Sequence, residues 1–286
     1  MKKNLEITTH IGCKVLCKYC PQSKIVEAYG KLKSKNVMTL SDFKKILSNV
    51  DNKDTKLIFA GFSECFLNKD SVDMIIHAWR QGFKIDIFTT TVGLTKTKIL
   101  KMKNAGVCFY AAAFHLFKSD RFFNKDKFYK IAKFFQDNIE TRVFKIVEVR
   151  KIVSRAGALF KISGKNGKII CLNNFVYQNV VLPNGDLVLC CNDFALKHKL
   201  GNLFEDKYSS NKLENERKKI LDLMKVEKSD IACRFCEMAV SDDKNNKIRF
   251  GTNKDFLKDD LRNIKRAAAV NKLKHKIKEK IKKENI

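Results

Sequence analysis

The sequence predicts an α/β fold: a partial (β/α)5-6 TIM-like barrel, then a small unit with a β-hairpin and a helix, then a basic C-terminal helix. Short apolar runs alternate with helical patterns through the first half of the chain. Strands separated by helices of roughly ten to fifteen residues imply right-handed β-α-β units and a parallel sheet. No G-x-G-x-x-G follows the first run, which favours a barrel over a dinucleotide-binding sheet.

Five apolar runs are the predicted strands of this barrel. They are 5–11, 56–62, 83–91, 106–116 and 141–149. The helical patterns between them are a capped helix that begins at Thr39 and the segments 70–81, 95–104 and 124–138. In barrels of this kind, functional groups lie where strands end and loops begin. We therefore expect the functional site at the carboxyl ends of these strands.

The pattern changes after residue 155. Two β-rich runs flank Pro183-Asn184-Gly185, a turn signal that indicates a hairpin. A polar helical stretch follows at 211–227, and ACRFC follows at 232–236. The expected parts of the chain are a barrel core at 1–160, a smaller unit at 161–245 and a basic helix at 246–286.

Composition limits the classes of protein that need to be considered. The 286 residues can bury a full-sized core, and no run of about 18 uncharged apolar residues predicts a membrane span. The first ten residues lack the apolar region of a signal peptide, so we expect a cytoplasmic protein. In a reducing compartment, ten cysteines favour metal binding or redox chemistry over structural disulfides.

The net charge of +27, from 58 Lys and Arg against 31 Asp and Glu, has two interpretations. One is a polyanionic partner, and the other is a generally lysine-rich composition. We favour the second, because the lysines are scattered rather than gathered on one motif. Nucleic-acid binding is disfavoured, because no segment gathers aromatic residues and arginines into a stacking platform.

The stretch CKVLCKYC places Cys13, Cys17 and Cys20 on one loop, directly after the first predicted strand. Three thiolates on one loop can bind three corners of an iron–sulfur cubane and leave its fourth iron without a protein ligand. Structural zinc sites usually take four protein ligands, commonly from C-x-x-C pairs. The spacing therefore favours an iron–sulfur cluster over zinc.

CKVLCKYC resembles the signature of the radical SAM superfamily, C-x-x-x-C-x-aromatic-C, with Tyr19 as the aromatic residue. The resemblance implies that the three cysteines hold a 4Fe–4S cluster whose open iron binds S-adenosylmethionine (SAM). It implies reductive cleavage to a 5′-deoxyadenosyl radical that abstracts a substrate hydrogen. It also implies an electron donor such as flavodoxin or ferredoxin, and packing of the backbone near Tyr19 against adenine.

Later segments resemble further motifs of that superfamily, in the same order. GFSE resembles its G-G-E stretch, TTTVG stands where T-N-G is common, and SRAG follows the fifth strand. Glu64 is expected to accept a hydrogen bond from the methionine ammonium. The SAM-binding residues that the resemblance implies, besides Tyr19, are Gly61, Phe62, Ser63, Glu64, Thr90, Thr91, Ser154 and Arg155. Alone, GFSE and SRAG would be ordinary strand-to-loop turns.

A second set of cysteines follows the barrel. The hairpin is expected to bring Cys171 and Cys190 together, and Cys233 and Cys236 in ACRFC can complete a four-thiolate site. Four thiolates suit zinc or a 4Fe–4S cluster about equally. Neighbouring residues of a strand face opposite ways, so we assign Cys190 rather than Cys191 as a ligand.

This second set resembles the auxiliary-cluster domains called SPASM and Twitch. Five cysteines are fewer than a complete SPASM domain needs, so the resemblance implies one auxiliary 4Fe–4S cluster and two clusters in all. The layout is similar to that of the 2-deoxy-scyllo-inosamine dehydrogenases and of radical SAM/SPASM proteins of polysaccharide pathways.

A fully ligated cluster has no vacancy for substrate, so we expect it to accept an electron. The predicted reaction is oxidation of a hydroxyl of a sugar or cyclitol, with His115 and Arg155 as substrate contacts or proton acceptors. The alternative is redox-neutral epimerisation, with Cys65 or Cys191 as the hydrogen donor. A ribosomal peptide is the rival substrate. We expect no N-terminal peptide-recognition domain, because the first predicted strand begins at residue 5.

The tail at 267–286 carries seven lysines and a narrow apolar stripe at helical spacing. We favour a helix that packs this stripe on the barrel. Peripheral contact with an anionic membrane is the alternative, and it would suit a lipid-linked glycan. A different class of protein also stays open: a non-catalytic zinc protein that binds polyanions.

Overall fold

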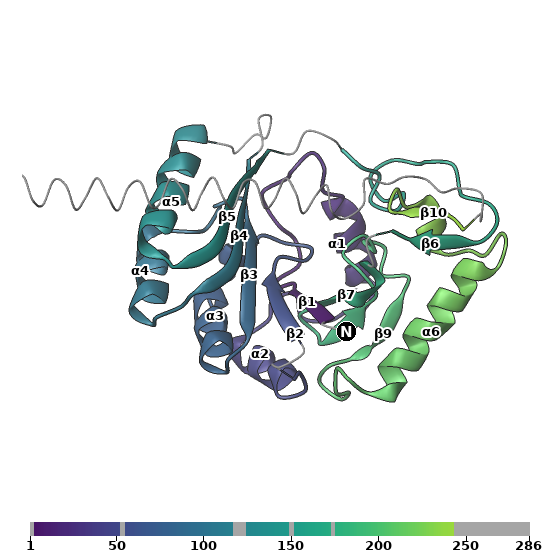
Figure 1. The fold of residues 1–286 in the computed structure, drawn as a ribbon, viewed down its shortest axis with the longest axis horizontal. Coiled ribbons are helices and arrows are strands. Elements are labelled where there is room, and N and C mark those ends of the chain that lie inside the picture. The colour runs from purple at the N-terminus through teal and green to yellow at the C-terminus, as the bar shows by residue number, and fades with distance from the viewer. Residues whose placement is uncertain (1–2, 52–54, 117–123, 149–151, 173–174, 243–286) are drawn as a thin grey trace, which may run out of the picture. The chain divides into compact units, whose positions relative to one another are not determined.

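The computed structural model describes residues 3–51, 55–116, 124–148, 152–172 and 175–242, which belong to one compact unit (Figure 1). The predicted C-terminal helix at 246–286 and its apolar stripe lie outside the described residues. Among the described residues, no helix has the length and apolar character needed to cross a membrane.

An eight-stranded mixed sheet forms the centre of the unit, in the order β5-β4-β3-β2-β1-β7-β8-β9 (Figure 1). The first six strands in that order run parallel, and β8 and β9 are antiparallel to their neighbours. The strands are β1 (Lys3–Ile7), β2 (Thr55–Phe59), β3 (Lys84–Thr89), β4 (Phe109–Leu116), β5 (Thr141–Glu148), β7 (Gln178–Val181), β8 (Asp186–Val188) and β9 (Lys199–Asn202). All five predicted barrel strands are present, so the predicted α/β class is confirmed.

The helices are α1 (Gln22–Gly30), α2 (Leu40–Leu47), α3 (Ser71–Arg80), α4 (Lys96–Asn104), α5 (Lys125–Asn138) and α6 (Asn211–Lys225). The side chains of Thr39, Thr95 and Asn124 cap α2, α4 and α5, which explains why the sequence predicted their starts well. The sequence analysis missed α1. Pro21 precedes it and has no side-chain acceptor for a cap, and only Gln22, Ile25 and Tyr29 of the helix are buried.

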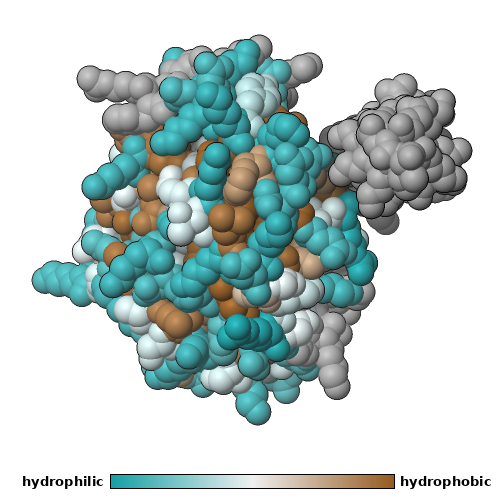
Figure 2. All heavy atoms as spheres, turned by 90° about the vertical axis from the view of Figure 1, so that its left-hand side faces the viewer, coloured by the Kyte–Doolittle hydropathy of each residue, from teal (hydrophilic) through white to brown (hydrophobic). Residues whose placement is uncertain are grey.

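Helices α3, α4 and α5 lie on one side of the parallel strands (Figure 1). Hydrophilic side chains predominate on the outward face over these helices (Figure 2). On the inner side of the helices, Phe114 of β4 lies 5.1 Å from Phe135 and 5.0 Å from Phe144 between ring centroids. Phe114 and Phe135 are both fully buried. These rings fix the position of β4, which carries His115 at the next residue.

The segment after residue 160 adds strands to the barrel sheet. The hairpin around Pro183 is present, but its first strand β7 pairs in parallel with β1. Asn179, Val180 and Val181 are fully buried, so this strand needs neighbours on both edges and both faces. A separate two-stranded sheet consists of β6 (Ile169–Cys171) and β10 (Ala239–Ser241).

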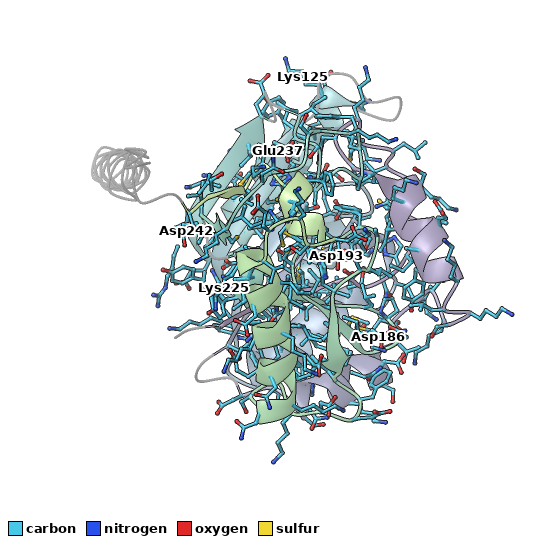
Figure 3. All side chains as sticks on the ribbon, turned by 90° about the vertical axis from the view of Figure 1, so that its right-hand side faces the viewer. Lys125, Asp186, Asp193, Lys225, Glu237 and Asp242 are labelled. Carbon is cyan, nitrogen blue, oxygen red and sulfur yellow. The ribbon has the colours of Figure 1, made fainter. Side chains whose placement is uncertain are left out.

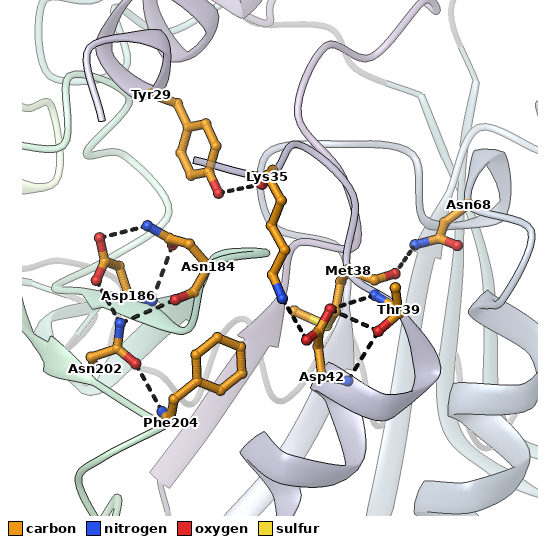
Figure 4. A network of polar contacts seen from close by, with 10 residues as sticks. All are labelled: Tyr29, Lys35, Met38, Thr39, Asp42, Asn68, Asn184, Asp186, Asn202 and Phe204. Carbon is orange, nitrogen blue, oxygen red and sulfur yellow. Dashed lines mark hydrogen bonds and ion pairs between the residues drawn. The ribbon is translucent and has the colours of Figure 1, made fainter. Parts of the chain in front are cut away.

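The hairpin turn is held by side chains, as Figure 4 shows. Asn184 Nδ2 donates to Asp186 Oδ2 over 2.9 Å, and Asn202 Nδ2 donates to Asp186 Oδ1 over 2.9 Å. Gly185 has φ +82°, and a Cβ there would lie 2.6 Å from Asn202 Oδ1. These contacts fix where β8 begins, and therefore where Cys190 and Cys191 emerge at its other end.

Phe114→Ala should lower the free energy of unfolding by about 3–5 kcal/mol, because it removes a fully buried ring and leaves a cavity. Urea denaturation followed by circular dichroism measures the change. Leu100→Ala on α4 is the control, since Leu100 is 40% exposed and should cost less than about 1 kcal/mol. Equal losses in the two variants would contradict this description of the core.

Candidate active site

A cavity of about 270 Å³ lies at the carboxyl ends of the parallel strands. Its lining comes from the loop after β1, the turn after β2, and the ends of β3 and β4, which is where a barrel places its functional groups. The lining residues are Glu6, Cys13, Val15, Cys17, Tyr19, Cys20, Gln22, Ala60, Gly61, Phe62, Ser63, Glu64, Phe88, Thr89, Thr90, His115, Arg155, Gln178, Cys191 and Phe194.

The three cysteines of CKVLCKYC all line this cavity. Gln22, the first residue of α1, ties the two ends of their loop together. Its Oε1 accepts from the backbone N–H of Cys13 over 3.0 Å, and its Nε2 donates to Cys20 Sγ over 3.3 Å. The same Nε2 donates to the backbone oxygen of Phe62 over 2.6 Å. Sequence reasoning missed Gln22, although its place two residues after the last cysteine could have indicated it.

These thiols fit an iron–sulfur cluster by their chemistry. The structure describes all ten cysteines of the chain, and none forms a disulfide. Burial raises the pKa of the Cys13 and Cys20 thiols, so without a cation they stay protonated. No three described Cys, His, Asp or Glu side chains are grouped around one point as ligands of a single ion. Thiolates on a cubane each bind a different iron, so they stand farther apart than ligands of one ion.

Glu64 is held by the end of β3. Its Oε1 accepts from Thr89 Oγ1 over 2.8 Å, and its Oε2 accepts from the backbone N–H and the Oγ1 of Thr90, each over 2.6 Å. The side chain is 4% exposed, and burial raises the pKa of its carboxyl group. Thr89, which the sequence analysis did not single out, therefore orients a predicted site residue.

The turn that carries Glu64 is fixed by a close approach to β1. The backbone N–H of Phe62 donates to Thr8 Oγ1 over 3.1 Å. Gly61 has φ +68°, and a Cβ there would lie 2.2 Å from that same oxygen. Only glycine fits at this point, which explains why GFSE begins with Gly61.

Glu6 is a second buried carboxylate of the cavity, and the sequence analysis missed it. Leu5 and Ile7 of β1 face the core, so alternation turns Glu6 to the cavity. It accepts from the backbone N–H of Gly61 over 3.1 Å, from Gln178 Nε2, and from the thiol of Cys191. Burial raises its pKa. An acidic residue between the apolar Leu5 and Ile7 is the signal that could have found it.

His115 and Arg155 both line the cavity, and the charge of Arg155 acts on the His115 ring. The His115 ring stacks on Phe88 with centroids 5.8 Å apart, and burial and the charge of Arg155 lower its pKa to about 4. The guanidinium carbon of Arg155 lies 5.9 Å from the centre of the Tyr19 ring. Its Nη1 donates to Asn192 Oδ1 over 3.3 Å. At neutral pH, His115 is therefore uncharged and Arg155 is the cation of the cavity.

Three residues predicted at the site do not line the cavity. Cys65 is fully buried behind Glu64, and Thr91 donates from its backbone to Thr89 Oγ1. Ser154 instead faces the segment after ACRFC: its backbone N–H and Oγ donate to the Glu237 carboxylate, and Oγ also donates to the Phe235 oxygen over 3.2 Å. The SRAG turn, and with it Arg155, is thus attached to the second cysteine segment, on the side of the unit shown in Figure 3.

The second set of cysteines is brought together as follows. Cys171 ends β6, opposite Ala239 of β10, and Cys233 lies in a short 3-10 helix at Ala232–Phe235. Burial raises the pKa of Cys233, and charge on Cys236 and Cys171 would raise it further. Burial also raises the pKa of Cys190, to which charge on Asp193, Cys233 and Cys236 would add. Cys190 therefore lies near ACRFC, while its neighbour Cys191, in the turn that follows β8, lines the cavity with Glu6.

Comparisons with known proteins support the fold. No protein-family model matches the chain. The PqqA peptide cyclase of Bradyrhizobium diazoefficiens is 27% identical over 110 residues, which span 38% of this chain and 27% of that protein.

Solved structures match over most of the chain. The structure of BtrN in complex with AdoMet and 2-DOIA matches with a TM-score of 0.59 and 17% identity, over 79% of this chain and 87% of that one. Streptococcus suis SuiB bound to precursor peptide SuiA matches with a TM-score of 0.55 and 12% identity, over 83% and 70%. anSMEcpe with bound AdoMet matches with a TM-score of 0.53 and 14% identity, over 83% and 84%. The chain therefore has the fold of the radical SAM enzymes that carry a SPASM-type auxiliary domain.

Proposed function

We propose that this chain is a radical SAM oxidoreductase that oxidises a hydroxyl of a sugar or cyclitol. One observation carries the proposal: a single cavity gathers the three thiols of CKVLCKYC, two buried carboxylates, a neutral histidine and an arginine. The matched structures of BtrN and anSMEcpe have AdoMet bound, which supports SAM as the ligand of this cavity.

Cys13, Cys17 and Cys20 would hold a 4Fe–4S cluster with one open iron. With SAM bound, the cluster would supply a radical able to take a hydrogen atom from a carbon. The chain's own part is to orient SAM. Glu64, held by Thr89 and Thr90, offers a carboxylate to the methionine ammonium. The proposed SAM contacts are the predicted residues that line the cavity: Tyr19, Gly61, Phe62, Ser63, Glu64, Thr90 and Arg155.

The second site would hold an auxiliary 4Fe–4S cluster, with Cys171, Cys190, Cys233 and Cys236 as ligands. It would supply an electron acceptor close to the cavity, because Cys190 is the direct neighbour of Cys191. An external donor such as flavodoxin or ferredoxin would supply the electron for SAM cleavage. The division into a core at 1–160 and an auxiliary unit at 161–245 belongs to this proposal.

The oxidation also needs a group that accepts a proton. A carbinol that has lost a hydrogen atom becomes a ketone when it loses the hydroxyl proton and one more electron. Glu6 is our candidate acceptor, because it is a buried carboxylate at the cavity wall and burial raises its pKa. His115 is neutral and is the second candidate. Arg155 would orient the hydroxyl oxygen.

Redox-neutral epimerisation is the second candidate function, and Cys191 favours it. This thiol lines the cavity, burial raises its pKa well above the usual value, and it donates to Glu6. A protonated thiol at the substrate is what a hydrogen-atom donor requires. Cys65, the other predicted donor, lies outside the cavity and is no longer a candidate.

Anaerobic reconstitution tests the cofactors. The wild-type chain should bind about eight irons, four for each cluster, and cleave SAM when reduced. The triple variant Cys13→Ala, Cys17→Ala and Cys20→Ala should keep about four irons and lose cleavage. Tightly bound zinc and no SAM cleavage by the wild-type chain would instead support a zinc protein that binds polyanions.

Product analysis separates the two reactions. For the oxidation, Glu6→Gln should lower kcat about 100-fold or more at saturating SAM on an accepted sugar substrate. Glu140→Gln on the surface is the matched control. Incorporation of solvent deuterium at an inverted carbon, abolished by Cys191→Ala, would overturn the oxidation in favour of epimerisation.

The depressed pKa of His115 predicts a pH-dependent stability. The folded chain binds this proton less readily than the unfolded chain, whose histidine pKa is about 6.5, so protonation favours unfolding below that pH. From pH 8 to pH 5, this group should remove about 2 kcal/mol of stability. Urea denaturation of the wild type and of His115→Gln at both pH values measures it. An equal pH dependence in both proteins would show that His115 does not titrate as described.

A further inference from the structure

A second cavity, of about 490 Å³, adjoins the first and has a strongly basic lining. Its lining includes four cationic side chains and one acidic side chain. The cations are Lys24 of α1, Arg155, Lys161 and Lys197, and the acid is Asp193. The remaining lining residues are apolar or small, apart from Asn192. These four cations come from three separate parts of the chain, since Arg155 and Lys161 belong to one segment, and the fold brings them around one space.

The single carboxylate of this cavity is already engaged. Asp193 Oδ1 accepts from the backbone N–H of Lys197 over 2.9 Å, and its Oδ2 accepts from the backbone N–H of His198 over 2.7 Å. Asp193 is 3% exposed, so its oxygens hold the turn that precedes Lys197 and contribute little to the open surface of the cavity. The charge that a bound molecule meets is therefore mainly positive.

The lysines are available to a ligand. Among the described residues, Lys24 and Lys197 form only exposed ion pairs, of 3.4 Å with Glu27 and of 3.6 Å with Asp230. Exposed pairs of this kind are weak and are readily exchanged. For Lys161, the described residues supply no ion pair or hydrogen bond that holds it. Three flexible ammonium groups can thus turn toward an anion inside the cavity.

Arg155 connects the two cavities, because it lines both. Its Nε is buried and has no hydrogen-bond partner among the described residues. Arg155 and Ala156 both have φ +54°, a conformation that costs energy for residues other than glycine and that recurs at ligand sites. The neighbouring residues Cys191 and Asn192 also connect the cavities, because Cys191 lines the first cavity and Asn192 lines the second.

We propose that the second cavity binds the phosphate or diphosphate group of a phosphorylated sugar, while the carbon that reacts lies in the first cavity. This proposal rests on the proposed function, and it adds the substrate class. Phosphate suits the lining because a guanidinium with an unused N–H can bind it through paired hydrogen bonds, and several ammonium groups can share its charge. The volume leaves room for a diphosphate.

Binding of inorganic pyrophosphate to the reconstituted full-length chain tests the proposal, by isothermal titration calorimetry without SAM or reductant. The variant Lys161→Gln/Lys197→Gln should bind pyrophosphate at least tenfold more weakly than the wild type. The matched control Lys130→Gln/Lys218→Gln removes the same charge from exposed positions on α5 and α6 and should stay within twofold. Arg155 is left unchanged, because it also lines the first cavity.

Equal weakening in both double variants would show binding to the overall charge of the chain and overturn the proposal. Unchanged binding in the Lys161→Gln/Lys197→Gln variant would overturn it too. Hexaglutamate is the probe for an acidic peptide. If the cavity variant loses hexaglutamate but retains pyrophosphate, the substrate class is wrong and an acidic peptide replaces it. Because no SAM cleavage is measured, failure of the radical chemistry and failure of this site are distinguishable.

Discussion

The hydrogen bonds of Glu6 are the constraint on which the arrangement depends. β1 lies between β2 and β7, and its one acidic side chain binds Gly61 after β2 and Gln178 at the start of β7. A buried carboxylate needs such partners, because burial without them is costly. Glu6 thereby joins the turn after β2, which carries Gly61, to the β7–β8 hairpin, which leads into Cys190 of the second cysteine set.

The β7–β8 hairpin positions part of the second cysteine set next to the first cavity. β8 ends at Val188, and in the turn that follows it Cys190 lies near ACRFC while Cys191 lines the first cavity. The bonds from Ser154 to Glu237 attach the SRAG turn to the same segment. Arg155 therefore stands where the first cavity, the second cavity and the second cysteine set meet, which is a suitable place to position a substrate.

Local patterns in the sequence predicted much of this, and long-range pairing was the part that they missed. The five strands were predicted because apolar runs mark buried parallel strands, and α2, α4 and α5 because capping residues mark helix starts. Helix α1 lacks both signals. Local signals could have indicated Glu6 and Gln22, but not the bond between Glu6 and Gln178, whose partners are 172 residues apart. The parallel pairing of β7 with β1 is of the same kind.

The central claim is that SAM binds to an iron of a cluster held by Cys13, Cys17 and Cys20. Electron paramagnetic resonance of the reduced, reconstituted chain with and without SAM tests it most directly. We predict that SAM changes the cluster spectrum of the wild type and of a Cys233→Ala/Cys236→Ala variant. A spectrum that SAM leaves unchanged in the wild type would contradict the account.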